Sequence, residues 1–411
     1  MEKKNNINFK LYSIYLISIL IPFFIYLDGS IYFEKLNTLN EKNIIFSTPI
    51  PISIFSSLLI LIFIIYKNKK LFFNIKIIKI LFACSIINLI IILSKGDINL
   101  KKIVYFIQFI IPWLGLLIAY NIKNEEGIFK IIFYFLSSLV TLQLLITIFK
   151  GKLILISDIY FFSVYQNIQY VSSIYVMLAA IVSINLYKKN KFKIILFNLI
   201  VLIYVLLTYS LSSIIIYTLF LLVAVFYHFY KSSIQLRIKY VLIFVVSLII
   251  FAHNFSSNQI HLDKSKFIFK KNYYENFQKF EDIKNFKIPK NFEKRMIIWK
   301  DYYDEIKSNK NIIFFGSQNY ELDETHKSAH NLILDIIYKF GFTLVITYLL
   351  LFLIIIKKIL YFKNQKQVNN FLSLFLILII SIIENMFKVS LKQPYPGLIS
   401  FYLIGYYLKK K

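Results

Sequence analysis

The residues whose types suit chemistry gather in one polar stretch, residues 295–341. It contains Arg295, one of only two arginines in a chain that uses lysine almost everywhere else. A guanidinium can bind a phosphate through two parallel hydrogen bonds, which an ammonium does less well. The stretch also contains His330, and a histidine can take a proton from a hydroxyl group near neutral pH. These two side chains predict a reaction on a phosphate-bearing substrate.

Arg295 lies in a segment whose pattern predicts an amphipathic helix. The apolar residues of this segment recur at helical spacing, at Met296, Ile297, Trp299 and Tyr303. Trp299 follows Arg295 by four positions, so both side chains should share one face of the helix. The alternative is a solvated arginine that pairs with Asp301 or Glu293.

His330 directly precedes a long apolar run, where a new helix is expected to begin. Ser328 or Asn331 can cap this helix start, because a short polar side chain accepts hydrogen bonds from unpaired main-chain N–H groups. A helix start also presents free N–H groups and a partial positive charge, which suit a diphosphate. The alternative is a surface histidine without a chemical role.

A metal site at the histidines is not expected. His326 and His330 are four positions apart, and Asp323 and Glu324 stand just upstream. The flanking ligand order of zinc-binding helices is missing, and His326 should precede the helix start. The sequence therefore predicts a site without a metal or another cofactor.

The polar stretch is embedded in a chain built from apolar runs. The chain has 411 residues, of which 58% are hydrophobic. Runs of about 17–23 apolar residues are long enough to cross a bilayer core of about 30 Å as helices. We predict twelve membrane spans, at 11–27, 44–66, 75–94, 103–120, 128–149, 168–187, 192–209, 211–230, 239–253, 332–356, 370–387 and 397–408. This pattern predicts one all-α polytopic membrane domain over residues 1–411.

Charge orients the predicted spans. The formal net charge is +27, and lysines concentrate in every second short gap between spans, which is typical of cytoplasmic loops. Both termini are then cytoplasmic, and one long loop at 254–331, with amphipathic helices inserted within it, faces the outside. The same distribution argues against a nucleic-acid partner. Cys84 is the single cysteine, so no disulfide within the chain can brace this loop.

Glu384 is a carboxylate inside the predicted span 370–387. On insertion scales, a charged residue within a span costs about 2.5–3.5 kcal/mol, so it is usually paired or functional. Because Glu384 is near the outer end of the span, an exposed position without a function is the alternative.

An ordered set of residues in the C-terminal half resembles the O-antigen ligase/polymerase superfamily. The set runs Arg295-x3-Trp299, then Gly316 in Phe314-Phe315-Gly316-Ser317, then His330-Asn331-Leu332, then Gly341, which is expected within the next helix. The similarity extends from about Leu206 to Phe352. That family also places a large outer loop between late spans of a helical membrane bundle.

The resemblance implies a metal-independent glycosyltransferase in the bacterial cytoplasmic membrane, with its active site facing the periplasm or the exterior. Its donor would be a glycan linked to undecaprenyl diphosphate, which an acceptor hydroxyl would displace. His330 would match the family's catalytic histidine, and Arg295 its diphosphate-neutralising arginine. Further substrate contacts are expected at Trp299, Asn331, Lys327, Gly316 and Glu384. Membrane lipid, a chain-length regulator and a flippase are the expected partners.

The chain departs from the family at one position. The family usually carries a Ser-Arg pair at the start of an earlier span, whereas Thr208-Tyr209-Ser210-Leu211 has leucine where the arginine is expected. Either Lys327 or Lys392 supplies the missing charge, or the phosphate is bound in a different way.

Several functions remain open from the sequence. We favour a polymerase that joins lipid-linked oligosaccharide repeats of O-antigen or capsule. A ligase that moves the finished glycan onto lipid A-core shares the chemistry and differs in the acceptor. A flippase or transporter for such lipids is disfavoured by the long loop and by the shortage of ionisable residues at mid-span. A structural partner of a synthesis complex is the remaining class.

Overall fold

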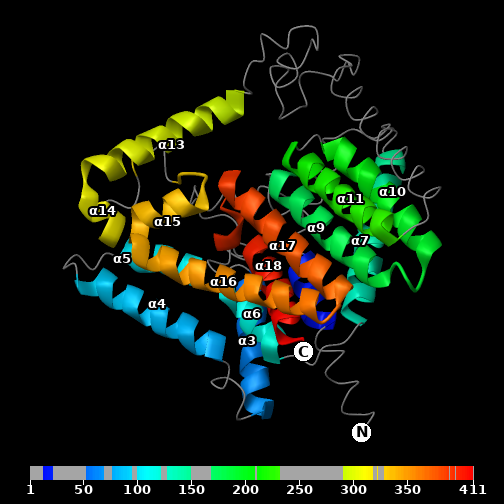
Figure 1. The fold of residues 1–411 in the computed structure, drawn as a ribbon, viewed down its shortest axis with the longest axis horizontal. Coiled ribbons are helices and arrows are strands. Elements are labelled where there is room, and N and C mark those ends of the chain that lie inside the picture. Colours follow the sequence, from blue (N-terminus) through cyan, green and yellow to red (C-terminus); the bar gives the residue numbers. More distant parts are fainter. Residues whose placement is uncertain are drawn as a thin grey trace.

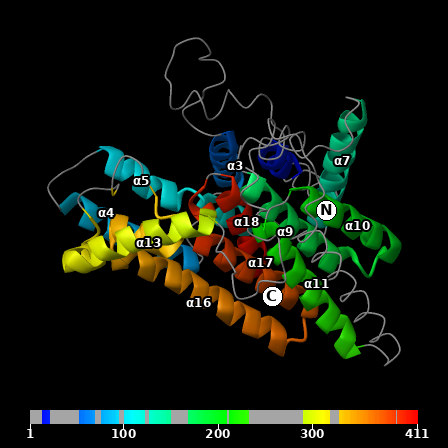
Figure 2. The same ribbon diagram turned by 90° about the horizontal axis from the view of Figure 1, so that it is seen from above.

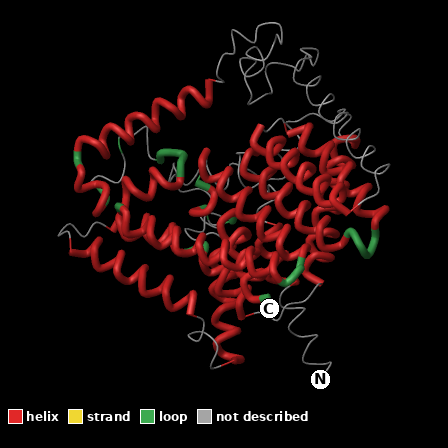
Figure 3. The backbone as a smooth tube through the Cα atoms, in the orientation of Figure 1, coloured by secondary structure: helices red, strands yellow, loops and turns green. Residues whose placement is uncertain are grey.

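The computed structural model describes residues 13–21, 52–68, 76–94, 100–121, 127–149, 168–208, 211–231, 290–317, 322, 328–387, 389–393 and 395–410. About 90% of these residues are helical, and none of them lies in a strand (Figure 3). The predicted all-α class is therefore confirmed for the described part of the chain.

Most of the predicted spans coincide with single helices to within two residues. These helices are α4 (Lys76–Ser94), α7 (Gly127–Phe149), α9 (Ile168–Leu186), α10 (Lys191–Thr208), α11 (Leu211–Lys231), α17 (Val368–Phe387) and α18 (Pro396–Lys409). Residues 13–21 and α3 (Ile52–Asn68) are the described helical parts of the first two spans. The predicted span at 239–253 lies outside the described residues.

The predicted spans at 103–120 and 332–356 are each two helices, so neither is the single continuous helix that was expected. The first breaks into α5 (Leu100–Ile110) and α6 (Trp113–Asn121) around Pro112. Proline has no N–H group and clashes with the preceding turn, so it begins a new helix more easily than it continues an old one. The second breaks into α15 (Leu332–Phe340) and α16 (Phe342–Asn364) at Gly341, whose φ of 74° ends the first helix.

The centre of the bundle is α18, in which every residue from Pro396 to Leu408 is buried. It packs along α6 at backbone contact distance. A Cβ atom at Gly115 would lie less than 3.0 Å from the carbonyl oxygen of Leu398, and one at Gly405 would also lie less than 3.0 Å from that of Leu116. Small residues that let two backbones approach in this way are typical of helix pairs in membranes.

Two groups of helices flank α18. On one side, α9 packs against α7, α10 and α11 (Figure 1). On the other side, α16 packs against α4, α15 and α17, and the view from above shows α13 (Lys290–Ser308) lying across this half of the molecule (Figure 2). The polar stretch identified in the sequence therefore belongs to the half of the bundle that contains α16.

One end of the bundle, which we name the lysine end, joins Lys358, Asn370 and Lys410. The Lys410 ammonium donates to the side chain of Asn370 at 2.9 Å, and the Lys358 ammonium donates to the carbonyl of Lys410. Nearby, the amide of Asn185 donates to the hydroxyls of Ser373 and Tyr407 at 3.1 and 2.9 Å. Because α16 and α17 run between this end and the other, His330 and Met386 lie at the opposite end, which we name the site end.

Apolar side chains face outward along α16. The exposed residues recur every three or four positions, at Ile346, Leu349, Leu353, Ile356 and Leu360, and Leu353 is 60% exposed. The inward face of the neighbouring α4 is polar, because the buried amide of Asn88 reaches the hydroxyl of Thr347 at 3.4 Å. Apolar residues outside and hydrogen-bonded polar residues inside are the pattern of a helix bundle in lipid.

Two of the described helices, α16 and α17, are long and apolar enough to cross a membrane. At 1.5 Å per residue, the 23 residues of α16 extend about 34 Å, compared with about 30 Å for a bilayer core. The structure therefore supports a helical, membrane-associated protein.

Candidate active site at the site end

The amphipathic helix predicted around Arg295 is α13, and its apolar face packs on α15. The ring of Tyr302, which is fully buried, meets the ring of Tyr338 edge-on, with 4.7 Å between centroids. Ile306 and Ala329 belong to the same small core. The helix is confirmed, but most of the apolar residues from which it was predicted are not the ones that pack on α15. Met296, Ile297 and Tyr303 are exposed, whereas Tyr302 and Ile306 are buried against α15.

Trp299 joins α13 to the segment that precedes α15. Its indole N–H donates to the carbonyl oxygen of Ala329 at 2.9 Å, and its ring lies 6.0 Å from that of Phe387 at the end of α17. Arg295, which is half-buried, lies one helical turn before Trp299. This hydrogen bond joins two residues that are 30 positions apart in sequence. It therefore brings α13, which carries Arg295, beside Ala329, the residue that precedes His330.

His330 is exposed and has a left-handed backbone, with φ of 50°. Only two described residues other than glycine have positive φ, and His330 is one of them. Its main-chain N–H points toward the hydroxyl of Ser328 at 3.4 Å, a long contact. Residues held in this sparsely populated region cluster at functional sites, where the surrounding structure supports them.

Asn331 is the N-cap of α15. Its side-chain oxygen accepts hydrogen bonds from the N–H groups of Ile333 and Leu334 at 3.1 and 3.2 Å, and its side-chain nitrogen donates to the carbonyl of Met386 at 3.3 Å. The predicted capping role is thus confirmed. The same bonds occupy two of the N–H groups that were expected to bind a diphosphate. The helix start keeps its partial positive charge, but these two N–H groups are not available to a ligand.

A buried carboxylate, Asp335, lies beneath the His330 segment. Its Oδ1 accepts from the main-chain N–H of Ala329 at 3.2 Å and lies 3.1 Å from the ammonium of Lys339. Its Oδ2 lies 2.6 Å from the ammonium of Lys392, which also sits 5.3 Å above the ring of Phe109. The side chains of Asp335 and Lys339 are 0% exposed and that of Lys392 is 9% exposed, so this is an ion pair with an added cation inside the protein.

The ionisation of Asp335 follows from this setting. Asp335 belongs to α15, outside the two helices that are long enough to span a membrane. Burial by itself raises the pKa of its carboxyl, but the charges of Lys392 and Lys339 outweigh burial and lower that pKa from 3.8 to about 2. The carboxylate is therefore ionised at neutral pH.

Lys392 reaches Asp335 from the 3-10 helix η6 (Ser390–Lys392), which follows α17. The side-chain oxygen of Asn385 accepts from the N–H of Leu391 at 3.1 Å and so ties η6 to the end of α17. Lys392 was one of two residues predicted to replace the family's missing arginine. Its ammonium is already paired with Asp335, which also pairs with Lys339, so the three side chains together keep a net charge of +1.

Glu384 lies one residue before Asn385 and is 2% exposed, so the alternative of an exposed carboxylate is wrong. It belongs to the same end of α17 as Phe387, which meets Trp299. The structure thus places Glu384 on the helix that borders the His330 segment. Its predicted contact with substrate stays a prediction.

Gly316 and Gly341 end two short helices that pack against each other. Gly316 follows α14 (Lys310–Phe315), and the N–H of the next residue, Ser317, donates to the carbonyl of Tyr338 at 2.6 Å. The close approach of the two backbones gives Gly316 a packing role, and its predicted contact with substrate stays a prediction. Lys327 and His326, by contrast, lie outside the described residues, so their predicted roles are not placed.

Sequence reasoning missed Asp335 and Lys339. The signal was present, because a carboxylate and an ammonium four positions apart inside the otherwise apolar run 332–340 would share one helix face. Such a pair within an apolar helix indicates a buried polar partner elsewhere in the chain. That partner, Lys392, follows 57 residues after Asp335 and could not be identified by spacing.

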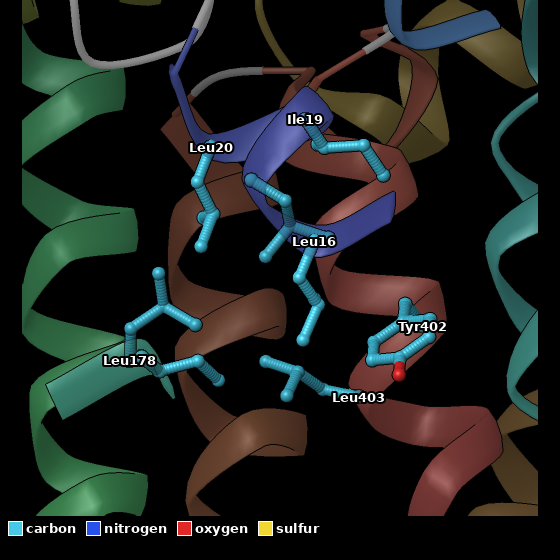
Figure 4. Close-up of a pocket in the computed structure, with 8 residues that line it drawn as sticks. Leu16, Ile19, Leu20, Leu178, Tyr402 and Leu403 are labelled. Atoms are coloured by element: carbon cyan, nitrogen blue, oxygen red, sulfur yellow. The ribbon is translucent and has the colours of Figure 1, made fainter. Parts of the chain in front are cut away.

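A small cavity elsewhere in the described part of the chain does not suit the proposed chemistry. An apolar cavity of about 10 Å³ lies between the helix at residues 13–21, α9 and α18 (Figure 4). Its lining is Leu16, Ile19, Leu20, Ile132, Leu178, Ile399, Tyr402 and Leu403. A cavity of this size and polarity is too small for a sugar and suits at most a single solvent molecule. Among the described residues, no three His, Cys, Asp or Glu side chains are grouped to hold a metal ion.

Comparison with known proteins assigns no family to this arrangement: no family model matches the chain, and no curated protein matches it at a significant level. The resemblance to the O-antigen ligase/polymerase superfamily therefore stays a prediction from the ordered residues of the C-terminal half.

Proposed function

We propose that this chain is a membrane glycosyltransferase that polymerises oligosaccharide repeats linked to polyprenyl diphosphate. The repeats would be those of O-antigen or capsule, and the reaction would take place at the outer face of the bacterial cytoplasmic membrane. The reaction needs a base for the acceptor hydroxyl and a cation for the departing diphosphate. His330 and Arg295 are the residues proposed for these two tasks.

The observation that carries the proposal is the hydrogen bond from the Trp299 indole to the carbonyl of Ala329. It brings the helix of Arg295 against the segment of His330, although the two residues are far apart in sequence. His330 is exposed there, and its left-handed backbone marks a position that the fold supports at a cost.

The proposed chemistry uses no cofactor. The oxygen of the acceptor hydroxyl attacks the anomeric carbon of the donor sugar as the His330 imidazole takes its proton. The bond between that carbon and the diphosphate oxygen breaks, and the electron pair leaves with the polyprenyl diphosphate. The guanidinium of Arg295 offsets the charge that grows on this leaving group.

The proposed topology has twelve spans, both termini in the cytoplasm and the site end outside. Lys358 and Lys410 gather at the lysine end, away from His330, and lysine-rich short loops are typical of the cytoplasmic side. The outward apolar face of α16 between these ends suits the hydrocarbon core. A carrier lipid in the outer leaflet would then present its diphosphate at the depth of the site end.

The test is the glycan ladder of a deletion strain that carries either the wild-type gene or a His330→Ala variant. The amount of each protein in the membrane is measured in parallel, and Ser308→Ala, a change in an exposed part of α13, is the control. We expect the His330 variant to place a single repeat on the surface lipid, while the control gives the normal ladder.

Three results would contradict this account. Loss of all surface glycan, with long polymer left on the carrier lipid, would indicate the ligase. A normal ladder at normal protein amount would remove His330 from the mechanism. If lipid-linked repeats failed to cross the membrane in the variant, a flippase would be the better account.

A further inference from the structure

The residue that precedes His330 is held from two directions. The N–H of Ala329 donates to Oδ1 of Asp335 at 3.2 Å, and its carbonyl accepts from the Trp299 indole at 2.9 Å. Ala329 itself is 0% exposed, so neither bond competes with solvent. Because peptide groups are planar, fixing this carbonyl also fixes the N–H side of His330. The two bonds together determine how the chain enters His330.

On its other side, His330 is followed by the N-cap of α15. The side chain of Asn331 binds the first turn of that helix and the carbonyl of Met386 in α17. His330 thus stands between two anchored residues, and its φ of 50° is what joins them. A left-handed residue other than glycine persists only where its surroundings determine it, which these contacts do.

Asp335 is suited to hold Ala329 because its own orientation is fixed. Both of its oxygens are engaged, Oδ1 by Lys339 and Oδ2 by Lys392 at 3.1 and 2.6 Å. Lys339 belongs to the same helix, whereas Lys392 comes from η6 beyond α17. The carboxylate therefore links the His330 segment to two other elements of the site end.

We infer that Asp335 is a positioning residue, which acts through Ala329 to present the His330 side chain to the substrate. It touches no substrate and transfers no proton. Its pairing with Lys392 keeps Oδ1 directed at the Ala329 N–H. The inference rests on the proposed function for the role of His330, but its structural part, that Asp335 orders the Ala329–His330 segment, can be measured without any activity.

Trp299 provides that measurement, because the chain has only two tryptophans. In a Trp113→Phe background, Trp299 is the sole tryptophan, and its indole binds the carbonyl of Ala329. Quenching of its fluorescence by acrylamide in the purified full-length protein then reports how well the segment is ordered. We expect Asp335→Ala to raise the quenching constant severalfold and to shift the emission to longer wavelength.

A matched control separates this effect from general destabilisation. Asn185→Ala removes side-chain hydrogen bonds to Ser373 and Tyr407 at the lysine end, far from Trp299. We expect this control to leave quenching of Trp299 unchanged. If Asn185→Ala raised the quenching as much as Asp335→Ala, or if Asp335→Ala left it unchanged, the inference would be overturned.

A second variant covers the case in which Asp335→Ala does not fold. Asp335→Asn combined with Lys392→Gln keeps an oxygen that can accept the Ala329 N–H. It also keeps the net charge of the group at +1, since Lys339 remains. We expect quenching of Trp299 close to that of the parent, because the amide oxygen still accepts from Ala329. High quenching would contradict ordering of the segment through Ala329.

The glycan ladder tests the consequence for the reaction. A displacement of about 1 Å at a reacting group costs up to about 100-fold in rate, so Asp335→Ala should shorten the ladder strongly at equal protein amount. If the quenching rose but the ladder stayed normal while His330→Ala abolished it, positioning would be refuted. If His330→Ala had no effect, the proposed function would fail, and quenching alone would decide whether Asp335 orders the segment.

Discussion

Gly316 lies against the backbone just before Gly341, and Gly341 lies against the backbone just before Gly316, at the ends of α14 and α15. A Cβ atom on Gly316 would lie less than 3.0 Å from the carbonyl oxygen of Lys339, and one on Gly341 would lie equally close to that of Phe314. Each glycine directly follows one of these helices and lies against the last turn of the other helix, so the contact is reciprocal. Both have positive φ, at 76° and 74°, with extended ψ. This region of backbone space is essentially restricted to glycine.

We therefore expect Gly341→Ala to destabilise the protein by more than the usual cost of a glycine change. Strained backbone costs about 1–3 kcal/mol, and the clash with Phe314 adds to it. The measurement is the amount of monodisperse protein extracted from membranes and its melting temperature. Gly127→Ala, at the first residue of α7, is the control and should be neutral or stabilising, because alanine favours helix. Equal behaviour of the two variants would show that the backbone contact is not close.

A second prediction concerns the geometry of the Arg295 side chain. We expect Arg295→Lys to lower the polymerisation rate about tenfold, since the loss of one charge-assisted hydrogen bond of about 1.5 kcal/mol corresponds to that factor. Arg295→Ala should lower it further. Lys300→Ala, an exposed change on the same helix, should have no effect. Chain elongation in isolated membranes is the readout, and full activity of Arg295→Lys would refute a bidentate phosphate contact.

The exposed apolar face of α16 gives a third prediction. If Leu353 faces lipid, Leu353→Lys places a charge near the middle of a span, which costs about 2.5–3.5 kcal/mol on insertion scales. On a water-exposed surface the same change would stay within about 0.5 kcal/mol. We expect a clear loss of protein that resists washing from membranes at high pH. Leu353→Phe, which keeps the apolar surface, should behave as wild type, and equal retention of the lysine variant would place this face in water.

The lowered pKa of Asp335 predicts how stability depends on pH. The folded pKa of about 2 lies below the unfolded value of 3.8, so the carboxylate stabilises the fold fully above the unfolded value. This contribution is lost as the pH falls from about 4 toward about 2, and it is constant between about pH 5 and pH 8. Melting curves of wild type and Asp335→Asn in detergent should therefore stay a fixed interval apart in that neutral range and converge in acid. An interval that changed between pH 5 and pH 8 would contradict the assignment.

The helices themselves could be predicted from the sequence, because their signals are local. The lengths and bounds of α4, α7 and α17 follow from unbroken apolar runs that end in lysines or polar residues. The helix around Arg295 follows from apolar residues at helical spacing, and Asn331 was recognisable as a cap from its type and position. Each of these features depends on residues within a few turns of one another.

The breaks within two predicted spans have local signals that hydropathy does not detect. Pro112 and Gly341 both lie inside long apolar runs, and run length alone predicts one continuous helix in each. Hydropathy measures only how apolar a segment is and does not detect a change of direction. For Gly341 the break also depends on α14, whose backbone occupies the space that a side chain would need.

The sequence by itself determined the helical class, the position of most helices and the residue types available for chemistry at the site end. Only the tertiary structure decided which of these residues meet. The Trp299–Ala329 bond and the Asp335–Lys392 pair join residues that are 30 and 57 positions apart in sequence. The burial of Glu384 likewise depends on the helices that surround it. Such contacts depend on how helices pack, and helix packing is set by the shapes of many side chains at once, which no spacing along one segment records.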